Sequence, residues 1–281
     1  MTSSAPALAL TGSTGFIGGN AARLLAHEGF DLRLLARAPE RAPQLAGAVA
    51  VRSSYADDAA TRESLAGVKT LFMVSGVEAP DRLQQHFALV DAAAGAGVEQ
   101  IVYTSFFGAA PDATFTLARD HFVTEEHIKE SGLDYTFLRD NFYLDFFAGL
   151  AGDDDVIRGP SGDGRAAGVA RIDVARTAAA VLRDPSVHAG RTYDLTGPES
   201  FTLTEVAQAL SDHTGRKIRF HDETVEEAYQ SRLRWPAEQW EYDAWVSTYT
   251  AIKVGELDGD STAIEDIAGR RPLSFAEFLA L

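Results

Sequence analysis

The stretch LALTGSTGFIGG, residues 8–19, joins a short apolar run to three evenly spaced glycines. The apolar run predicts a buried strand, and residues 18–28 predict a helix. Between them, Gly12 permits a sharp turn, Gly15 lets backbone amides approach a pyrophosphate, and Gly18 allows the helix to pack tightly on the sheet. Because both flanks fit, we interpret the stretch as the turn of a dinucleotide-binding domain rather than as a glycine-rich turn without a ligand.

The alternation of strand and helix continues along the chain. Further strands are predicted at residues 31–37, 48–53, 70–75, 100–105, 135–140 and 192–197. Helices are predicted at residues 58–66, 80–96 and about 117–131, each closed by a glycine, as is the helix at 18–28. Such repeated βαβ units predict an α/β fold with a Rossmann-type doubly wound parallel sheet.

The pattern becomes less regular after Asn141. Residues 151–168, AGDDDVIRGPSGDGRAAG, are rich in glycine and aspartate and predict a surface segment without metal-ligand spacing. A second helical region begins near Thr202, which is placed to cap it. We expect a nucleotide-binding domain over residues 1–150, to which residues of about 165–198 return. A smaller, mostly helical substrate-cleft domain is expected over residues 199–281. Its tryptophans and tyrosines fit either an ordinary helical core or an aromatic lid over a flat substrate.

The composition excludes several classes of function. A formal net charge of -16 disfavours nucleic acid and anionic membranes as partners. The chain has no cysteine, and therefore neither disulfides nor thiolate chemistry. The first twelve residues lack a basic region, and their apolar run is too short for a signal peptide or a membrane span. We expect a soluble, cytoplasmic protein that acts on a small molecule, either as a monomer or as a homodimer.

Arg37 predicts which dinucleotide is bound. It stands at the end of the second predicted strand, where an NAD enzyme usually has an acidic residue for the ribose 2′-hydroxyl. A guanidinium suits a 2′-phosphate instead, so NADPH is favoured over NADH, although a solvated arginine is the alternative. Asp57 is placed either to contact the adenine amino group or to cap the helix that follows. The remaining residues predicted to bind the cofactor are Thr14, Phe16, Ile17, Ser75, Gly76 and Thr104.

Several segments carry a resemblance to a known family. They are LLARAPERA, AGVKTLFMVSG, AAGAGVEQIVYTS, ESGLDYTFLRDNFYLDFF and LTGPESFTLTEVAQALSDHTGRKI. Together with the glycine motif they resemble the NmrA-like branch of the atypical short-chain dehydrogenases/reductases. Within it the chain is most similar to the NADPH:quinone oxidoreductase and triphenylmethane reductase group. The resemblance implies a Rossmann domain that binds the cofactor, a small carboxyl-terminal domain and a substrate cleft between them.

The same resemblance places the active-site serine of the wider superfamily at Ser105. The superfamily's tyrosine and lysine belong to the next helix, where this chain has Leu117 and His121. A Tyr-x-x-x-Lys pattern does occur at YTAIK, residues 249–253, but in the small domain. Because so short a pattern arises easily by chance, we interpret YTAIK as a coincidence on one helix face.

The missing pair limits the chemistry that we expect. Reduction of a ketone needs a positioned acid, whereas a quinone becomes a fairly stable phenolate and a triarylmethyl cation becomes neutral on accepting hydride. Holding such an acceptor flat against the nicotinamide would supply much of the catalysis. The residues predicted to catalyse the reaction are Ser105, Asn141 and His121, the last as a side chain of its helix able to donate a proton near neutral pH. The residues predicted to contact the acceptor are Phe106, Phe107, Phe142 and Tyr143, beyond the carboxyl ends of the strands.

Three functions fit these observations. The first is an NADPH-dependent reductase of quinones or similar flat electrophiles that uses neither flavin nor metal. The second is a non-catalytic NADP-binding redox sensor that signals through a partner protein, as the regulatory NmrA-like members imply. The third is a reductase of a double bond in a natural product. Similarity to the reductase group through YTFLRDNFYLDFF and the aromatic second domain favour the first.

Overall fold

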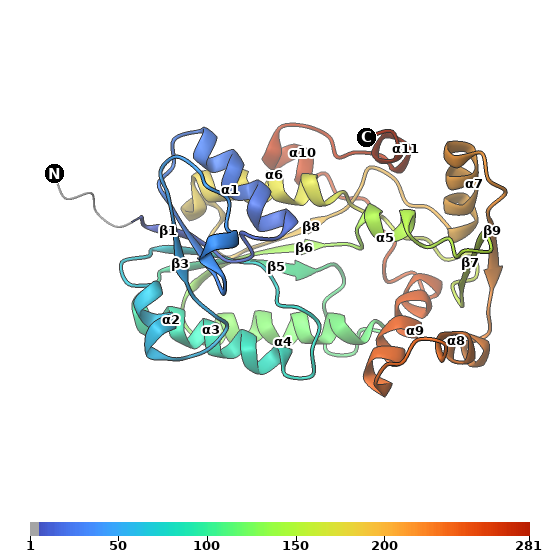
Figure 1. The fold of residues 1–281 in the computed structure, drawn as a ribbon, viewed down its shortest axis with the longest axis horizontal. Helices are drawn as coiled ribbons and strands as arrows, with labels where there is room; N and C mark the ends of the chain where they lie inside the picture. Colours follow the sequence, from blue (N-terminus) through green and yellow to red (C-terminus); the bar gives the residue numbers. More distant parts are fainter. Residues whose placement is uncertain (1–5) are drawn as a thin grey trace. The chain divides into compact units, whose positions relative to one another are not determined.

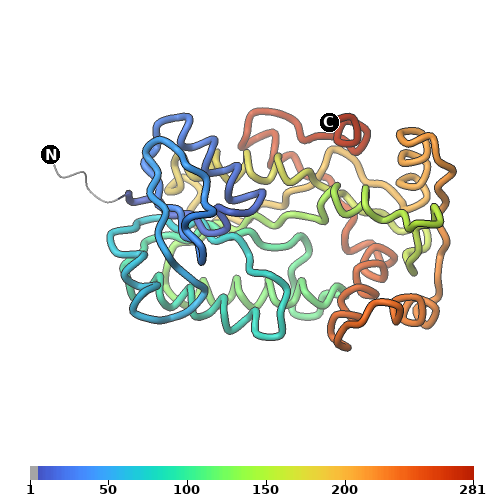
Figure 2. Tube along the Cα trace, in the orientation of Figure 1, coloured from blue at the N-terminus to red at the C-terminus, as the bar shows by residue number. Residues whose placement is uncertain are grey.

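The computed structural model describes residues 6–281, which form two compact units. The first contains the residues up to Ser105 together with Phe122–Arg139 and Arg171–Tyr193. The second contains Phe106–His121, Asp140–Ala170 and Asp194–Leu281. Each unit thus combines segments that are distant in the sequence, which Figure 2 distinguishes by colour. The domains expected from the sequence, residues 1–150 with about 165–198 and residues 199–281, divide the chain into fewer segments than these two units do. The substrate-cleft role of residues 199–281 stays a prediction.

Residues 6–281 form a seven-stranded sheet with the strand order β3-β2-β1-β4-β5-β6-β8 (Figure 1). β1 pairs in parallel with β2 and with β4, and the pairs β2–β3 and β4–β5 are parallel as well. The strand order reverses at β1, which is the arrangement of a doubly wound sheet and confirms the predicted fold class. The strands are β1 (Leu8–Leu10), β2 (Leu32–Ala36), β3 (Ala48–Arg52), β4 (Thr70–Met73), β5 (Gln100–Phe106), β6 (Asp134–Asp140) and β8 (Arg191–Leu195).

Helices cover both faces of the sheet in the first unit (Figure 1). α1 packs against α6 on one face, while α2 packs against α3 on the other, where α4 also runs. α3 ends at Gly97, whose φ of 80° gives the left-handed end that the sequence predicted. The bounds are α1 (Phe16–His27), α2 (Ala59–Ser64), α3 (Arg82–Ala96), α4 (Thr116–Glu130) and α6 (Arg171–Arg183), with short 3-10 helices at η1 (Pro39–Arg41) and η2 (Pro185–His188).

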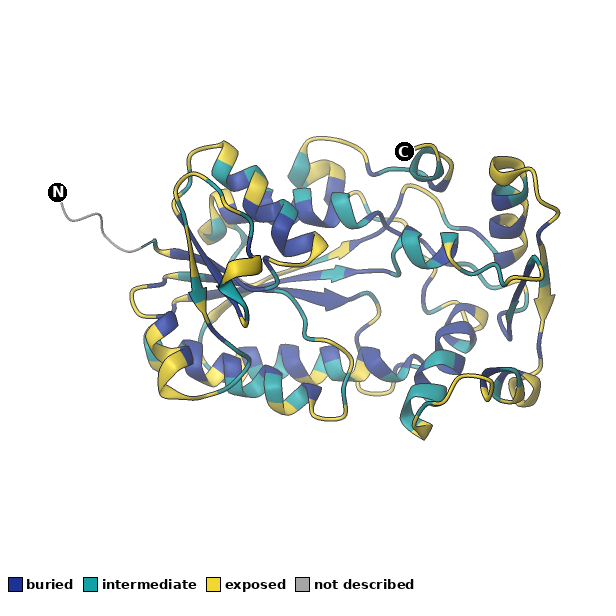
Figure 3. Cartoon of the chain, viewed as in Figure 1, coloured by how far each residue is buried: buried dark blue, intermediate teal, exposed yellow. Residues whose placement is uncertain are grey.

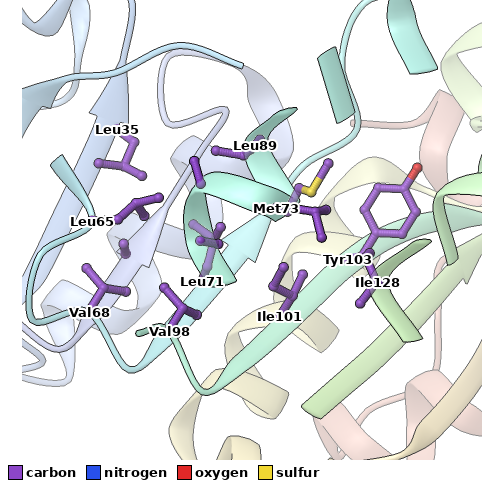
Figure 4. Packing of buried hydrophobic residues seen from close by; sticks show 14 of the residues in the cluster. Leu35, Leu65, Val68, Leu71, Met73, Leu89, Val98, Ile101, Tyr103 and Ile128 are labelled. Atoms are coloured by element: carbon purple, nitrogen blue, oxygen red, sulfur yellow. The ribbon is translucent and has the colours of Figure 1, made fainter. Parts of the chain in front are cut away.

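One hydrophobic cluster of the first unit lies between the sheet and the helices around α3. Figure 4 shows Leu71 and Met73 of β4 beside Leu89 of α3, with Tyr103 of β5 and Ile128 of α4 completing the cluster. Figure 3 shows the central strands as buried along their length. Because helices cover both faces, these strands are continuous apolar runs rather than alternating ones. Each buried side chain of this size contributes about 1.5–3 kcal/mol to folding.

The turn after β1 brings main chain against main chain. Gly12 has a φ of +62°, and a Cβ added there would lie 2.8 Å from the Cβ of Val74. A Cβ added at Gly18 would lie 2.5 Å from the carbonyl oxygen of Gly12. α1 can start this close to the end of β1 only because both residues lack a side chain. The assignment of a tight turn to Gly12 and of close packing to Gly18 agrees with this geometry.

The described part of the second unit is mostly helical, and it also contains a parallel pair of strands, β7 (Val156–Gly159) and β9 (Arg219–Asp222). Residues 151–168 were expected to be a surface segment, and this was wrong for β7, because Val156 and Ile157 are buried. Thr202 caps α7 as predicted, since its hydroxyl oxygen accepts the amide N–H of Glu205 at 3.1 Å. The helices are α5 (Leu144–Ala148), α7 (Leu203–Thr214), α8 (Val225–Arg232), α9 (Gln239–Lys253), α10 (Ala263–Ala268) and α11 (Phe275–Leu279).

A buried histidine lies beneath the sheet in the first unit. His86 of α3 has no exposed surface, and its Nε2 accepts the amide N–H of Gly76 at 2.8 Å. Its Nδ1 lies 2.9 Å from the hydroxyl of Thr124. Since Nε2 accepts, the neutral ring carries its proton on Nδ1 and donates it to Thr124. Burial lowers the pKa of His86 to about 3, and the charge of Arg82 acts in the same direction.

This histidine predicts a specific loss of stability in acid. In the unfolded chain His86 binds a proton as the pH falls through its ordinary value of 6.5, whereas in the folded protein it stays neutral down to about pH 3. Between these values the unfolded state binds one more proton, so the free energy of unfolding falls with falling pH by about 1.4 kcal/mol per pH unit. Above pH 6.5 the contribution of His86 is constant.

Urea unfolding between about pH 4 and pH 8 measures this slope. The variant His86→Gln, which cannot titrate, should lose stability in acid less steeply than the unaltered protein. The control His213→Gln removes an exposed histidine and should keep the original slope. Equal acid slopes in His86→Gln and in the unaltered protein would show that His86 is protonated in the folded state.

Candidate functional site

A cavity of about 500 Å³ lies in the first unit, beyond the carboxyl ends of β1, β2 and β4. Ligands of doubly wound sheets bind at this place, where the strand order reverses. Five segments line the cavity: the glycine turn, the end of β2, the residues after β3, the residues after β4 and the first turn of α3. The lining residues are Thr11, Gly12, Thr14, Gly15, Leu35, Ala36, Arg37, Ser53, Ser54, Tyr55, Val74, Ser75, Gly76, Val77, Ala79 and Gln85.

The glycine turn forms one wall of the cavity. The amide N–H of Gly15 donates to the carbonyl oxygen of Gly12 at 2.9 Å, which closes the turn just before α1. α1 has no acidic residue in its first turn, so its amino-terminal N–H groups present an uncompensated positive end. A Cβ at Gly15 would come no nearer than 3.3 Å to the turn itself. The fold therefore tolerates a side chain at Gly15 better than at Gly12 or Gly18, and a ligand that approaches the turn gives a reason for glycine there.

Arg37 provides the charge of the cavity. It follows β2 directly, is exposed, and is the only charged residue among the described lining residues. No Asp or Glu is among the described residues that line the cavity at the end of β2. In place of a carboxylate that would accept a hydrogen bond from a ribose 2′-hydroxyl, the chain has the guanidinium of Arg37, which can only donate. A guanidinium in a cavity that Ser53 and Ser54 also line suits a phosphate oxygen.

Tyr55 is a lining residue that the sequence analysis missed. Its hydroxyl donates to the carbonyl oxygen of Val74 and lies 2.9 Å from the hydroxyl oxygen of Thr11. Burial raises the pKa of Tyr55 to about 12, so the phenol is neutral at ordinary pH. Its position three residues after the end of β3 was the available signal, although the sequence pattern favoured Asp57, two residues further on.

Six of the residues predicted to bind the cofactor line the cavity, and five do not. Asp57 is exposed and pairs with Arg62 at 2.6 Å and 2.8 Å, while Asp58 is the residue that caps α2. Thr104 lies behind the wall, where its hydroxyl oxygen accepts the amide N–H of Ser75 at 2.8 Å. The lining six are Gly12, Thr14, Gly15, Arg37, Ser75 and Gly76, and the others are Phe16, Ile17, Gly18, Asp57 and Thr104.

Phe16, Ile17 and Gly18 support the glycine turn from the α1 side. Ile17 is buried, and Gly18 makes the close main-chain contact described above. Phe16 is 45% exposed, and the guanidinium of Arg171 lies 4.6 Å from the centre of its ring. This cation–π contact fixes the orientation of Phe16 beside the start of α1.

Ser105 is part of a buried polar network. Its hydroxyl donates to Glu125, and neither side chain has exposed surface. Arg139 holds the same carboxylate with two hydrogen bonds of 2.8 Å and 2.6 Å. Such a bidentate pair compensates the cost of burying the charge. Ser105 does not line the cavity, so its predicted catalytic role gains no support from this geometry.

Two of the four predicted acceptor residues, Phe106 and Phe142, belong to an aromatic cluster in the second unit. Phe106 and Phe142 have ring centres 5.1 Å apart, and each lies within 5.1 Å of Phe115. His121 is buried at 5.9 Å from the ring of Phe106, and Phe146 stacks on Phe142 at 5.1 Å. Phe115 and Phe146 were not predicted from the sequence, although both lie within aromatic-rich stretches.

Asn141 organises the backbone beside this cluster. It is buried, its amide nitrogen donates to the carbonyl oxygen of Leu257 at 3.0 Å, and its amide oxygen accepts the N–H of Phe142 at 2.8 Å. Tyr143 donates its hydroxyl to Asp140 at 2.6 Å. Phe107 packs so closely on Gly259 that a Cβ there would lie 2.8 Å from its ring. Both ends of the Asn141 amide are thus hydrogen-bonded within the second unit, and its predicted catalytic role stays a prediction.

The residues of YTAIK have separate environments although they share α9. The ring of Tyr249 covers Gly159, where a Cβ would lie 2.1 Å from a ring atom, and the guanidinium of Arg232 lies 4.9 Å from the ring centre. Burial raises the pKa of the Tyr249 hydroxyl, whereas Lys253 is exposed. Tyr249 therefore packs the second unit, which agrees with the interpretation of YTAIK as a coincidence.

No group of three or more His, Asp or Glu side chains among residues 6–281 is arranged to hold a metal ion. In the same part of the chain, no helix has the length and apolar character needed to cross a membrane.

Comparison with known proteins identifies the family. The model of the NAD(P)H-binding family matches residues 12–185. Quinone oxidoreductase 2 of Escherichia coli K12 is 33% identical, over 76% of this chain and 77% of its own. The NAD(P)H azoreductase of Xenophilus azovorans is 30% identical, over 96% of this chain and 95% of its own.

Solved structures agree over almost the whole chain. The NADPH complex of the quinone oxidoreductase QOR2 from Escherichia coli has a TM-score of 0.89 at 28% identity, with 97% of this chain and 98% of that chain covered. The NADP(H) complex of triphenylmethane reductase from Citrobacter sp. has a TM-score of 0.86 at 28% identity, with 97% and 99% covered. The cavity at the glycine turn, the doubly wound sheet and these similarities lead to one conclusion: the chain belongs to the NAD(P)H-binding family.

Proposed function

We propose that this protein is an NADPH-dependent reductase that passes hydride directly to a quinone or a similar flat, electrophilic acceptor. The observation that carries the proposal is the cavity at the glycine turn, in which Arg37 is the only charged side chain among the described lining residues. When bound, NADPH supplies the hydride. The preference for quinone-like acceptors is supported by relatives named quinone oxidoreductase, azoreductase and triphenylmethane reductase.

The residues present fit the cofactor. Gly15 and the amino-terminal end of α1 would hold the pyrophosphate, because N–H groups and the helix dipole favour negative charge there. Arg37 would bind the 2′-phosphate of the adenosine ribose, because its guanidinium supplies local positive charge on a chain of formal net charge -16. The carbonyl and hydroxyl groups after β4 would face the remainder of the dinucleotide.

The positions of the side chains also favour an acceptor that needs no dedicated acid. Ser105 is committed to Glu125, and Tyr249 is buried beneath Arg232 with its pKa raised. A quinone takes up hydride as a phenolate and then gains its proton from water, while a triarylmethyl cation needs no proton at all. The contacts of Phe106, Phe107, Phe142 and Tyr143 with the acceptor, and a proton from His121, stay predictions. So do a cytoplasmic location and a monomeric or homodimeric state.

The direct test is NADPH oxidation with a panel of quinones, azo dyes, triarylmethyl dyes and enones. We expect turnover of quinones or cationic dyes without added flavin or metal. Tight binding of NADPH without turnover of any acceptor would contradict the proposal and favour the redox sensor.

Arg37→Asp should reverse the preference for NADPH over NADH. Loss of one charged hydrogen bond costs about 1.5–3 kcal/mol, which raises the dissociation constant of NADPH about 10- to 100-fold. Fluorescence titration with both cofactors measures the change. Arg41→Asp makes the same change of charge at an exposed position that does not line the cavity, and it should have a much smaller effect. Equal affinities of the unaltered protein for NADPH and NADH would contradict the role of Arg37.

Tyr249→Phe should leave turnover nearly unchanged. The substitution keeps the ring over Gly159 and removes only the hydroxyl, so we expect a change in kcat of less than about threefold. Lys253→Met tests the other half of the pattern and should also have little effect. If the pair were the catalytic acid, Tyr249→Phe would lower kcat about 10²- to 10⁴-fold while cofactor binding stayed intact.

A further inference from the structure

The cavity wall after β4 is held from behind by three side chains. Its consecutive residues Val74, Ser75 and Gly76 all line the cavity, and each amide N–H donates to a side chain rather than to a main-chain carbonyl group. The three acceptors are the Oγ1 of Thr11, the Oγ1 of Thr104 and the Nε2 of His86, each at 2.8 Å.

These bonds fix the directions of the carbonyl groups. In a trans peptide the C=O points opposite to the N–H of the next residue, and the described chain contains no cis peptide. The bond from Gly76 to His86 therefore turns the carbonyl of Ser75 away from His86. The carbonyl of Val74 accepts the hydroxyl of Tyr55, so its direction is fixed as well.

His86 can support the wall in only one tautomer and one orientation. Its ring has no exposed surface, lies with its centre 6.0 Å from the ring of Tyr55 and 5.8 Å from that of Tyr103, and is oriented by the hydroxyl of Thr124. A Cβ at Gly76 would lie 3.1 Å from Nε2, so the wall approaches the ring closely. Only the tautomer with hydrogen on Nδ1 makes both bonds. A buried ring with both nitrogens engaged holds one orientation.

We propose that His86 is a positioning residue for the cofactor. By accepting the N–H of Gly76, it holds the Ser75–Gly76 peptide so that the Ser75 carbonyl accepts a hydroxyl or amide hydrogen of the bound dinucleotide. His86 itself does not line the cavity and acts only through the wall. The proposal rests on the proposed function, because NADPH is the ligand concerned.

Two substitutions of His86 separate this role from simple packing. The amide oxygen of His86→Gln reaches approximately as far as Nε2 and can accept from Gly76. The shorter amide of His86→Asn reaches only as far as Nδ1, where its N–H can donate to Thr124 as the ring does. We expect the dissociation constant of NADPH, measured without any acceptor, to rise about 5- to 20-fold in His86→Asn and to stay within about threefold of the original in His86→Gln. Melting temperatures of both variants are measured in parallel.

A second pair tests the same support through Thr124. Thr124→Ser and Thr124→Ala both lose the buried methyl group, but only serine keeps the hydroxyl that orients His86. NADPH should bind to Thr124→Ser almost as tightly as to the unaltered protein and several-fold more weakly to Thr124→Ala. This pair also decides the question if His86→Asn does not fold.

The outcomes are distinct. Unchanged NADPH affinity in His86→Asn or in Thr124→Ala would overturn the positioning role while leaving the reductase proposal intact. Equal weakening within a pair, in step with a fall in melting temperature, would overturn it in favour of a purely structural role. Failure of the unaltered protein to bind NADPH would instead contradict the proposed function.

Discussion

The close packing of α1 on the end of β1 is the constraint on which the site depends. With Gly12 at a φ of +62° and Gly18 in contact with its carbonyl oxygen, main chain packs on main chain with no side chain between. This contact aims the amino-terminal end of α1 at the place where the strand order reverses. The wall that the glycine turn gives to the cavity follows from that placement, and Arg37 lines the same cavity from the end of β2.

Local patterns were sufficient to predict the sheet and the part of the site that is local in sequence. Every predicted strand is present, because apolar runs of strand length between glycine-closed helices have few other solutions. Gly12, Gly15 and Arg37 were found for the same reason: a turn and a strand end can be recognised from their immediate neighbours. The strand β7 was missed because Val156 and Ile157 form a very short apolar run within a segment rich in glycine and aspartate.

The supporting residues of the site could not be predicted, because their partners are distant in the sequence. His86 is hydrogen-bonded to Thr124, which is 38 residues away in the sequence, and Tyr55 is hydrogen-bonded to Thr11, which is 44 residues away. In the sequence a lone histidine in a helix and a tyrosine after a strand are typical of many environments. Ser105 is a further example: a family resemblance suggested its catalytic role, which stays a prediction, whereas its hydrogen bond to Glu125 is visible only once α4 lies against β5. Residues that line a cavity were thus easier to predict than those that hold its wall.

Deuterium tracing tests the claim of direct hydride transfer most directly. The protein is given NADPH that carries deuterium on one face of nicotinamide C4, together with a triarylmethyl cation dye whose reduced form keeps the transferred hydrogen on carbon. For one of the two labelled faces, mass spectrometry should find one deuterium in the reduced dye, and a reaction with unlabelled NADPH in D₂O should introduce none. Reduced dye whose new hydrogen comes from the solvent would contradict direct transfer and require an intermediate carrier.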